Sequence, residues 1–156
     1  MQLIGPNLTA VRTSTEGPEF TLGTTHLDPA TGKRYKYVQY DTGAGSVAAV
    51  AGNVCYYYAP SGASAGAYTK VTSDLSDSAA VGAGALMAVI ADEGYGWIQT
   101  WGVATLNTAL TAGADGNALT PVGSTDGTLD VSALVTDHIA AIAVDISAKI
   151  VFLTCP

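Results

Sequence analysis

The sequence predicts an all-β protein, a small antiparallel β-sandwich or barrel with an extended N-terminal arm. Short segments rich in Val, Ile, Thr and Tyr recur along the chain, and turn residues separate them at regular intervals. Eighteen glycines and a charged fraction of 12% favour many turns and short strands over long helices. With 156 residues, 48% of them hydrophobic, the chain is long enough to bury one core. We therefore expect a single β domain over residues 20–156, preceded by an arm over residues 1–19.

The arm is expected to be poorly ordered when it is free. Residues 1–19 show weak hydrophobic periodicity, contain two prolines and are rich in small polar side chains. Terminal segments of this kind become ordered only when something holds them. Asn7-Leu8-Thr9 matches the acceptor pattern for N-glycosylation, but no secretion signal is visible, so we interpret the match as fortuitous.

Several strands are expected in the first half of the domain. An Asp-Pro-Ala-Thr-Gly turn at residues 28–32 precedes a segment in which Tyr35 and Tyr37 alternate with Lys36, as in a half-buried strand. The run Asn-Val-Cys-Tyr-Tyr-Tyr at residues 53–58 has high β-propensity. The expected strands cover residues 20–23, 34–40, 53–58 and 68–72, with a weak strand or a turn at residues 47–50.

Residues 82–103 form the expected centre of the sheet, because they contain both tryptophans and include an apolar run. Two strands here are joined by a turn at Asp92-Glu93-Gly94. Since residues two apart on a strand share a face, the bulky side chains fall on one side and the small ones on the other. The bulky face carries Tyr95, Trp97, Gln99, Trp101 and Val103. We predict that this face lies in the core or forms an oligomer interface, where Trp and Tyr are enriched.

The last third of the domain is punctuated by two Asp-Gly turns, which are strong hairpin signals. They lie at residues 114–117 and 125–128. The strands expected around and after them cover residues 118–120, 128–131, 138–146 and 149–153. Frequent alanines leave a helix over residues 132–144 as an alternative.

Charge is unevenly distributed along the chain. Residues 1–70 have a net charge of +1, and residues 71–156 have −8. Nucleic-acid binders need Lys and Arg to displace counterions, and anionic membranes repel acidic proteins, so we expect neither partner. The longest strongly apolar run, near residues 85–91, is too short to span a bilayer. The acidic half either keeps the protein soluble or faces a basic partner.

One basic cluster stands out in the acidic chain. It consists of Lys33, Arg34 and Lys36 on the strand expected at residues 34–40 and just before it. Lysines on a strand edge discourage aggregation between sheets, which is the simpler interpretation. The alternative is a contact with an acidic partner.

No constellation of residues points to catalysis, and no catalytic residue or cofactor is expected. The sequence Gly-Ala-Ser-Ala-Gly around Ser64 matches the pattern of a hydrolase nucleophile, but that motif needs a helix after the serine, and none is expected here. The two histidines, His26 and His138, lack orienting partners in the sequence.

No metal site is expected either. The residues Asp115, Asn117, Asp126 and Asp130 lack the spacing of a calcium-binding loop and are interpreted as turn residues. Cys55 and Cys155 have neither the spacing of a zinc site nor the number that a disulfide framework needs, so reduced thiols are expected.

A series of glycine-containing patterns runs through residues 20–153. In order they are Tyr-Lys-Tyr-Val at 35–38, Gly-Asn-Val at 52–54, Gly-Tyr-Gly-Trp-Ile-Gln at 94–99, Gly-Val-Ala at 102–104 and Gly-Ala-Asp-Gly-Asn-Ala-Leu at 113–119. In these patterns and their order the chain resembles the small head decoration, or cement, proteins of tailed bacteriophages and related prophages. The first 19 residues take no part in the resemblance.

The resemblance implies a β-rich, non-enzymatic viral structural protein, commonly a homotrimer, that binds the outside of an assembled phage capsid and stabilises it. Its partner would be the major capsid protein, and its location the outer surface of the virion after synthesis in the bacterial cytoplasm. We expect capsid contacts in the arm and along the basic edge, at Leu3, Ile4, Leu8, Arg12, Lys33, Arg34 and Lys36. The alternative is a carbohydrate- or receptor-binding β module that uses a face formed by Trp97 and Trp101, and a hydrolase using Ser64 is the third hypothesis.

Overall fold

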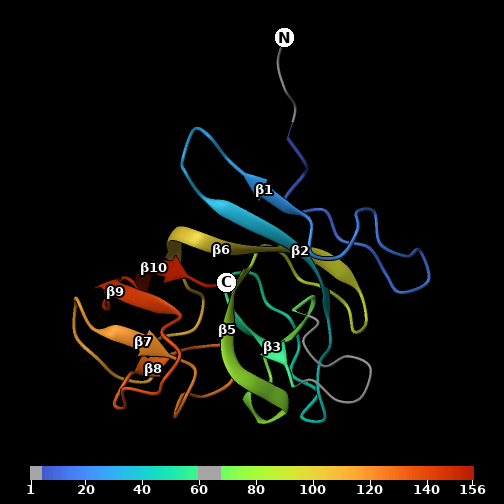
Figure 1. Ribbon diagram of the computed structural model, residues 1–156. Coiled ribbons are helices and arrows are strands. Elements are labelled where there is room, and N and C mark those ends of the chain that lie inside the picture. Colours follow the sequence, from blue (N-terminus) through green and yellow to red (C-terminus); the bar gives the residue numbers. More distant parts are fainter. Residues whose placement is uncertain (1–4, 60–67) are drawn as a thin grey trace.

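The protein is nearly all β, as the sequence predicts. The structure, a computed structural model, describes residues 5–59 and 68–156. Strands account for 38% of the chain and helix for 2%. Five strands close into a barrel, and further strands continue the same ten-stranded sheet beyond it (Figure 1). We call the continuation past β6 (Tyr95–Thr105) the smaller sheet.

The barrel closes where the first and the last of its strands meet. Its members, in spatial order, are β2 (Arg34–Tyr40), β4 (Lys70–Thr72), β3 (Val54–Tyr58), β5 (Ser78–Leu86) and β6 (Tyr95–Thr105). Pairing of β6 with β2 completes the barrel and places Trp97 opposite Tyr37. The pair β2–β4 is parallel, whereas the other barrel pairs are antiparallel. The barrel therefore departs in one pair from the purely antiparallel arrangement that the sequence predicts.

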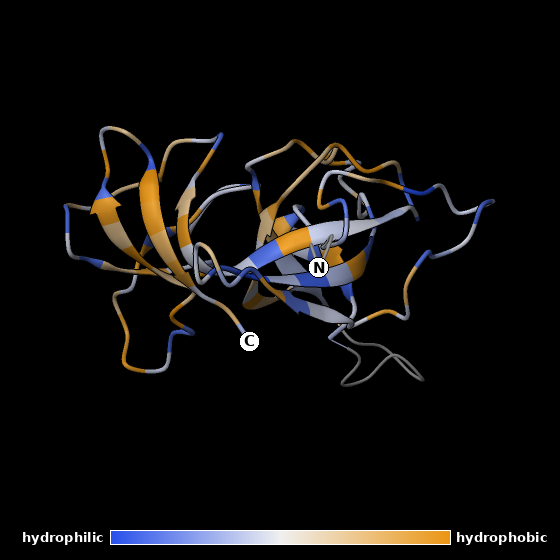
Figure 2. Ribbon diagram, turned by 90° about the horizontal axis from the view of Figure 1, so that it is seen from above, coloured by the Kyte–Doolittle hydropathy of each residue, from blue (hydrophilic) through white to orange (hydrophobic). Residues whose placement is uncertain are grey.

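Strand β6 serves both parts of the molecule. Its residues 101–105 pair with β10 (Ile150–Thr154), beyond which follow β9 (Ala141–Asp145), β7 (Ala118–Thr120) and β8 (Asp130–Val131). At the other side, β1 (Thr25–Leu27) forms a hairpin with the beginning of β2. Figure 2 shows the barrel and the smaller sheet side by side, with hydrophobic residues concentrated on the strands of the smaller sheet.

A bend in β6 allows this strand to take part in both the barrel and the smaller sheet. Gly102 has a φ of 96°, in the region that favours glycine. The side-chain nitrogen of Gln99 lies 3.2 Å from the main-chain oxygens of Trp101 and Gly102 and 3.0 Å from that of Val103. The glycine permits the bend, and the buried glutamine holds it.

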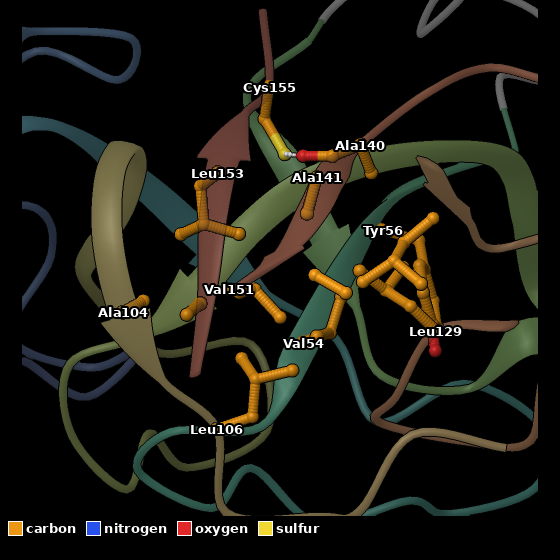
Figure 3. Close-up of a cluster of buried hydrophobic side chains, with 13 residues drawn as sticks. Val54, Tyr56, Ala104, Leu106, Leu129, Ala140, Ala141, Val151, Leu153 and Cys155 are labelled. Carbon is orange, nitrogen blue, oxygen red and sulfur yellow. Dashed lines mark hydrogen bonds between the residues drawn. The ribbon is translucent and has the colours of Figure 1, made fainter. Parts of the chain in front are cut away.

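Buried side chains form three clusters among the described residues. The first fills the barrel and contains Val38, Tyr40, Cys55, Val71 and Ile98 among others. The second lies between the barrel and the smaller sheet, where Val54 and Tyr56 of β3 face Ala141, Val151 and Leu153 (Figure 3). The third lies on the outer side of the barrel and contains Tyr35, Tyr37 and Trp97, with Leu8, Phe20 and Leu22 packed against them. The second cluster therefore ties the barrel and the smaller sheet into one body.

The described part of the arm lies against the barrel. Arg12 and Tyr95 exchange two main-chain hydrogen bonds, of 2.9 and 2.8 Å. Leu8 contacts the aromatic cluster around Trp97. Leu3 and Ile4 lie outside the described residues. The boundary between arm and domain at residues 19 and 20 stays a prediction.

Most of the expected strands are present, and the differences are local. Residues 20–23 and 47–50 are irregular, and the helix considered over residues 132–144 does not form. Phe20 instead packs edge-on against Tyr37 and Trp97, which explains its apolar character without a strand. The turn at residues 92–94 is confirmed, with Glu93 in the left-handed region at a φ of 56°.

Candidate binding surface

The two tryptophans lie in different environments, although they are four residues apart on one strand. Trp97 is 1% exposed and packs against Phe20 and Tyr37, with ring centroids 5.3 and 5.2 Å away. Trp101 is 37% exposed. The bend at Gly102 separates the covered side of the barrel from the open side of the smaller sheet. A single exposed face with both tryptophans, which the sequence suggested for carbohydrate binding, is therefore absent.

The first four residues of the face predicted to form a core or an oligomer interface, Tyr95, Trp97, Gln99 and Trp101, divide accordingly. Trp97 and Gln99 are buried, and Tyr95 is half-buried beneath the arm. Trp101 lies at the surface. Whether it contacts another subunit stays a prediction.

An apolar strip covers the outward side of the smaller sheet. Val103 of β6, Phe152 of β10 and Ile142 of β9 are direct neighbours across three adjacent strands. Trp101 packs edge-on against Phe152, with 5.4 Å between ring centroids. We call this strip the outer face, and it consists of Trp101, Val103, Ile142, Val144 and Phe152.

The outer face is open to solvent. Val103 is 45% exposed, Ile142 37% and Val144 47%. Between them on the same strands, Ala104, Ala143 and Val151 point inward and are buried. The sheet is therefore apolar on both sides, although the described chain covers only one of them. Contiguous exposed apolar surface of this kind marks interaction sites in soluble proteins.

A groove adjoins the outer face at Trp101. It lies between the β1–β2 hairpin and the end of the chain beyond β10 and has a volume of about 440 Å³. Its lining includes Thr25, His26, Leu27, Arg34, Lys36, Thr100, Trp101, Cys155 and Pro156. We call it the basic groove, because Arg34 and Lys36 are its charged residues.

Both cations of the basic groove are held in place. The guanidinium of Arg34 lies 5.5 Å from the ring centroid of Trp101, within range of a cation–π contact. The ammonium of Lys36 donates to the hydroxyl of Tyr57 at 2.7 Å and lies 4.9 Å from the centroid of that ring. Burial lowers the pKa of Lys36 from its ordinary value.

The structure assembles some of the predicted capsid contacts and separates others. Arg34 and Lys36 line the same groove, and the Cγ of Lys33 lies 3.2 Å from where a Cβ on Gly102 would be. Arg12 is instead engaged with Glu16 and Glu19, each at 3.8 Å. Leu8 is half-buried on the barrel.

The remaining candidate sites have structural explanations where they are described. The turn residues considered for calcium accept main-chain N–H groups: Asp115 from Ile146, Asn117 from Ala114, Asp126 from Leu75 and Asp130 from Val131. No group of three potential metal ligands occurs in residues 5–59 and 68–156. Ser64 lies outside the described residues.

The histidines are at least partly covered, and both cysteines are buried. His26 stacks on Tyr35, and burial lowers the pKa of His138. Cys55 and Cys155 are both buried and unpaired, as the sequence predicted for reduced thiols. Burial raises the pKa of Cys155 to about 12 and that of Cys55 well above its ordinary value. A buried thiol with a raised pKa is a poor nucleophile.

The outer face was not predicted from the sequence. The segments Ala-Ile-Ala-Val-Asp and Ile-Val-Phe-Leu-Thr are apolar at successive positions, a pattern that favours strands buried on both sides. The exposure of Ile142 and Val144 on one side is visible only once the strands are placed at the outside of the smaller sheet.

Comparisons with known proteins identify no related protein or structure. No protein-family model matches the chain, and searches of curated proteins and of solved structures give no match either. Within the described residues, no helix has both the length and the apolar character needed to cross a membrane.

Proposed function

We propose that this protein is a non-enzymatic structural protein that binds the outside of an assembled phage capsid as a homotrimer and stabilises it. The observation that carries the proposal is the outer face, an apolar strip across three paired strands. The resemblance of the sequence to phage head decoration proteins supplies the kind of partner.

The outer face suits a protein partner better than a small ligand. Its residues come from three neighbouring strands, and Val103, Phe152 and Ile142 lie side by side across them, so they form part of a sheet face instead of a pocket. It contains aromatic and aliphatic side chains without a charged residue among them. Aromatic residues are enriched, and charges depleted, at the centres of protein interfaces.

Repeated attachment makes modest contacts sufficient. A trimer that binds several equivalent capsid sites gains through effective concentration, because the second and third contacts are intramolecular. A small apolar strip on each subunit is then enough for stable binding, and no single contact has to be strong.

The test is sedimentation with expanded phage heads that lack a decoration protein. We expect the wild type to sediment with the heads and Val103→Glu to remain largely in the supernatant. Val89→Glu is the matched control, because Val89 is 65% exposed in the loop before β6 and is not part of the outer face. If the wild type stays in the supernatant at every concentration, the proposal is wrong.

Analytical ultracentrifugation of the free protein tests the trimer separately. A mass of three chains is expected for the wild type. A monomer at all concentrations contradicts the trimer, while leaving capsid binding to the sedimentation experiment.

Carbohydrate binding is the second candidate, and the exposed ring of Trp101 favours it. The ring is already contacted by Arg34 and Phe152, which leaves less of it for stacking on a sugar. A glycan array with Trp101→Ala as control separates the candidates, and a wild type that binds no glycan removes this one.

A further inference from the structure

The positive charges of this acidic protein fall into two groups. The first group is neutralised: Lys70 lies 2.6 Å from Asp41 and 3.0 Å from Glu93. Arg12 belongs to the same group, through its two glutamate partners. Such pairs leave little positive electrostatic potential to attract a ligand from outside.

The second group has no aspartate or glutamate partner in the described chain. Lys33, Arg34, Lys36 and Lys149 form no ion pair with any carboxylate in the part of the chain that the structure describes. Two of these four line the basic groove, and Lys33 adjoins Arg34 in the chain. Uncompensated positive charge therefore gathers at one place in a protein whose net charge is −7.

The strand register places the two groove cations on one wall. Arg34 and Lys36 are two residues apart on β2 and so share a face. Their partners across the hairpin, Leu27 and Thr25, complete that wall. No aspartate or glutamate is among the described residues that line the groove. A carboxylate that enters the groove therefore meets the two cations without a competing acidic side chain from its described lining.

Lys36 is prepared for an anion. Its ammonium carries three donors, of which one is used by the Tyr57 hydroxyl, and a second reaches the main-chain oxygen of Pro156 at 3.4 Å. Partial burial removes water from the ammonium and lowers the pKa of Lys36, and no aspartate or glutamate of the described chain pairs with it. An incoming carboxylate supplies the missing counter-charge.

We propose that the basic groove receives a carboxylate side chain of the capsid protein, which pairs with Arg34 and Lys36, while an apolar residue next to that carboxylate packs on Trp101. This inference rests on the proposed function, since it names the chemistry by which the same surface recognises its partner. Trp101 belongs both to the groove and to the outer face, so one partner segment contacts the two without a break. Because the groove cations lie next to the apolar outer face, the surface favours a partner segment with an acidic residue beside apolar residues. Charge complementarity sets the orientation of that segment.

A protein carboxylate fits these observations better than a nucleic-acid phosphate. A nucleic acid needs a track of cations, and the second half of the chain, which supplies β7 to β10, carries −8. A single carboxylate needs only the local pair of cations, which the groove provides.

The experiment uses expanded heads of the same kind, treated with nuclease. It measures how the binding of the protein to these heads depends on protein concentration, for the wild type, Arg34→Gln, Lys36→Gln and the control Lys149→Gln. Lys149 is a matched control, because it also lacks an ion-pair partner in the described chain but lies before β10, outside the groove. Arg34→Gln is expected to weaken binding about tenfold, with a similar loss for Lys36→Gln and none for Lys149→Gln. Raising the ionic strength should weaken the wild type more than Arg34→Gln, because salt screens the pair that the variant lacks.

Carbodiimide cross-linking gives a second readout. The reagent activates a carboxylate, and the amine of a contacting lysine displaces the activated oxygen to form an amide. We expect Lys36 or Lys33 joined to an aspartate or glutamate of the capsid protein, identified by mass spectrometry. Thermal melting followed by circular dichroism checks that each variant is folded.

The outcomes separate the two proposals. If the wild type binds heads and both groove variants bind as Lys149→Gln does, the groove proposal is overturned and the proposed function stands. If binding disappears when the heads are treated with nuclease, the ligand is nucleic acid, and the proposed contact with a capsid carboxylate is wrong. If the untreated heads do not bind the wild type, the proposed function fails and this inference fails with it.

Discussion

The side-chain nitrogen of Gln99 lies 3.0 Å from the main-chain oxygen of Val103, so a residue buried at the barrel positions a residue of the outer face. The same nitrogen reaches the main-chain oxygens of Trp101 and Gly102, each at 3.2 Å. These contacts span the bend at which β6 leaves the barrel and joins the smaller sheet. The shape of the proposed binding surface thus depends on an amide that does not itself reach the surface.

Replacing Gln99 should therefore destabilise the fold and disturb the outer face together. Gln99→Ala leaves main-chain oxygens at the bend without this donor, and we expect a loss of about 1–3 kcal/mol in the free energy of unfolding. Gln99→Glu should cost more, because it places a carboxylate against carbonyl oxygens. Urea denaturation measures both.

Gln39→Ala is the control for this prediction. Its amide also donates hydrogen bonds, to the main chain and carboxylate of Glu93, but at a partly exposed site. A loss of less than about 1 kcal/mol is expected there. Equal losses for Gln39→Ala and Gln99→Ala would show that the bend does not depend on Gln99.

A close approach of β5 to β6 makes Gly84 irreplaceable. A Cβ on Gly84 would lie 2.2 Å from the main-chain oxygen of Gln99, and the φ of 150° disfavours other residues. We expect Gly84→Ala to cost more than about 3 kcal/mol, since main chain cannot move aside as a flexible side chain can. Gly32→Ala is the control, because its φ of 70° carries the backbone cost while a Cβ there meets nothing within 4 Å. Thermal unfolding should rank the two variants clearly, and similar melting temperatures would contradict the close approach.

The sequence predicts the strands well where one side of a strand is polar or small. The alternation of Tyr35, Lys36 and Tyr37 predicts β2 correctly, and the Asp-Gly pairs correctly mark the turns around β7 and β8. These signals are local, because turn chemistry and side-chain alternation act within a few residues.

The candidate surface was less predictable because it depends on contacts distant in sequence. The alternation in β6 predicts Trp97 and Trp101 on one side of the strand, and this is wrong. The register with β2 shifts by one residue between Gln99 and Trp101, so Trp97 lies opposite Tyr37 and is covered by Phe20, whereas Trp101 lies opposite Arg34 and is exposed. The strand expected at residues 20–23 is absent, because the apolar character of Phe20 reflects its packing on Trp97 and not a place in a sheet. Tertiary packing, and not local pattern, decides both cases.

The ion pair between Lys70 and Asp41 should make stability depend on pH. Burial raises the pKa of Asp41, but hydrogen bonds from Lys70 and from the main chain of Gly43 outweigh it and leave the pKa below its ordinary value. Burial likewise lowers the pKa of Lys70, but hydrogen bonds to Asp41 and Glu93 leave it above its ordinary value. The stabilisation from Asp41 is therefore present above about pH 4 and lost as the pH falls through the lowered pKa. The contribution of Lys70 is present below about pH 10 and lost as the pH rises through the raised pKa.

Lys70→Met tests this pH dependence. The pair is partly exposed, so we expect the variant to be about 0.5–1 kcal/mol less stable than the wild type at neutral pH. The difference should shrink towards zero at about pH 2, where the carboxylates are protonated. Urea unfolding at several pH values measures it, with Lys149→Met as control. A difference that stays constant from neutral to acid pH would mean that Lys70 acts through packing alone.

Neither cysteine should react with a thiol reagent while the protein is folded. Cys55 and Cys155 are buried, and burial raises the pKa of each thiol, so the reactive thiolate is scarce. We expect no release of chromophore from a disulfide reagent in native buffer and two equivalents after denaturation. Rapid labelling of the native protein would show that the C-terminal end of the sheet opens at Cys155.

Acrylamide quenching should separate the two tryptophans and report on the proposed binding surface. Trp97 is 1% exposed, and its indole nitrogen has no hydrogen-bond partner among the described residues, so its emission should be blue-shifted and weakly quenched. Trp101 is 37% exposed and should be quenched readily. Trp101→Phe is therefore expected to remove the quenchable fraction and leave the rest. Quenchable emission that persists in Trp101→Phe would mean that the cover formed by Phe20 opens in solution. In the wild type, binding to heads should protect the quenchable fraction, because Trp101 lies where the outer face meets the basic groove.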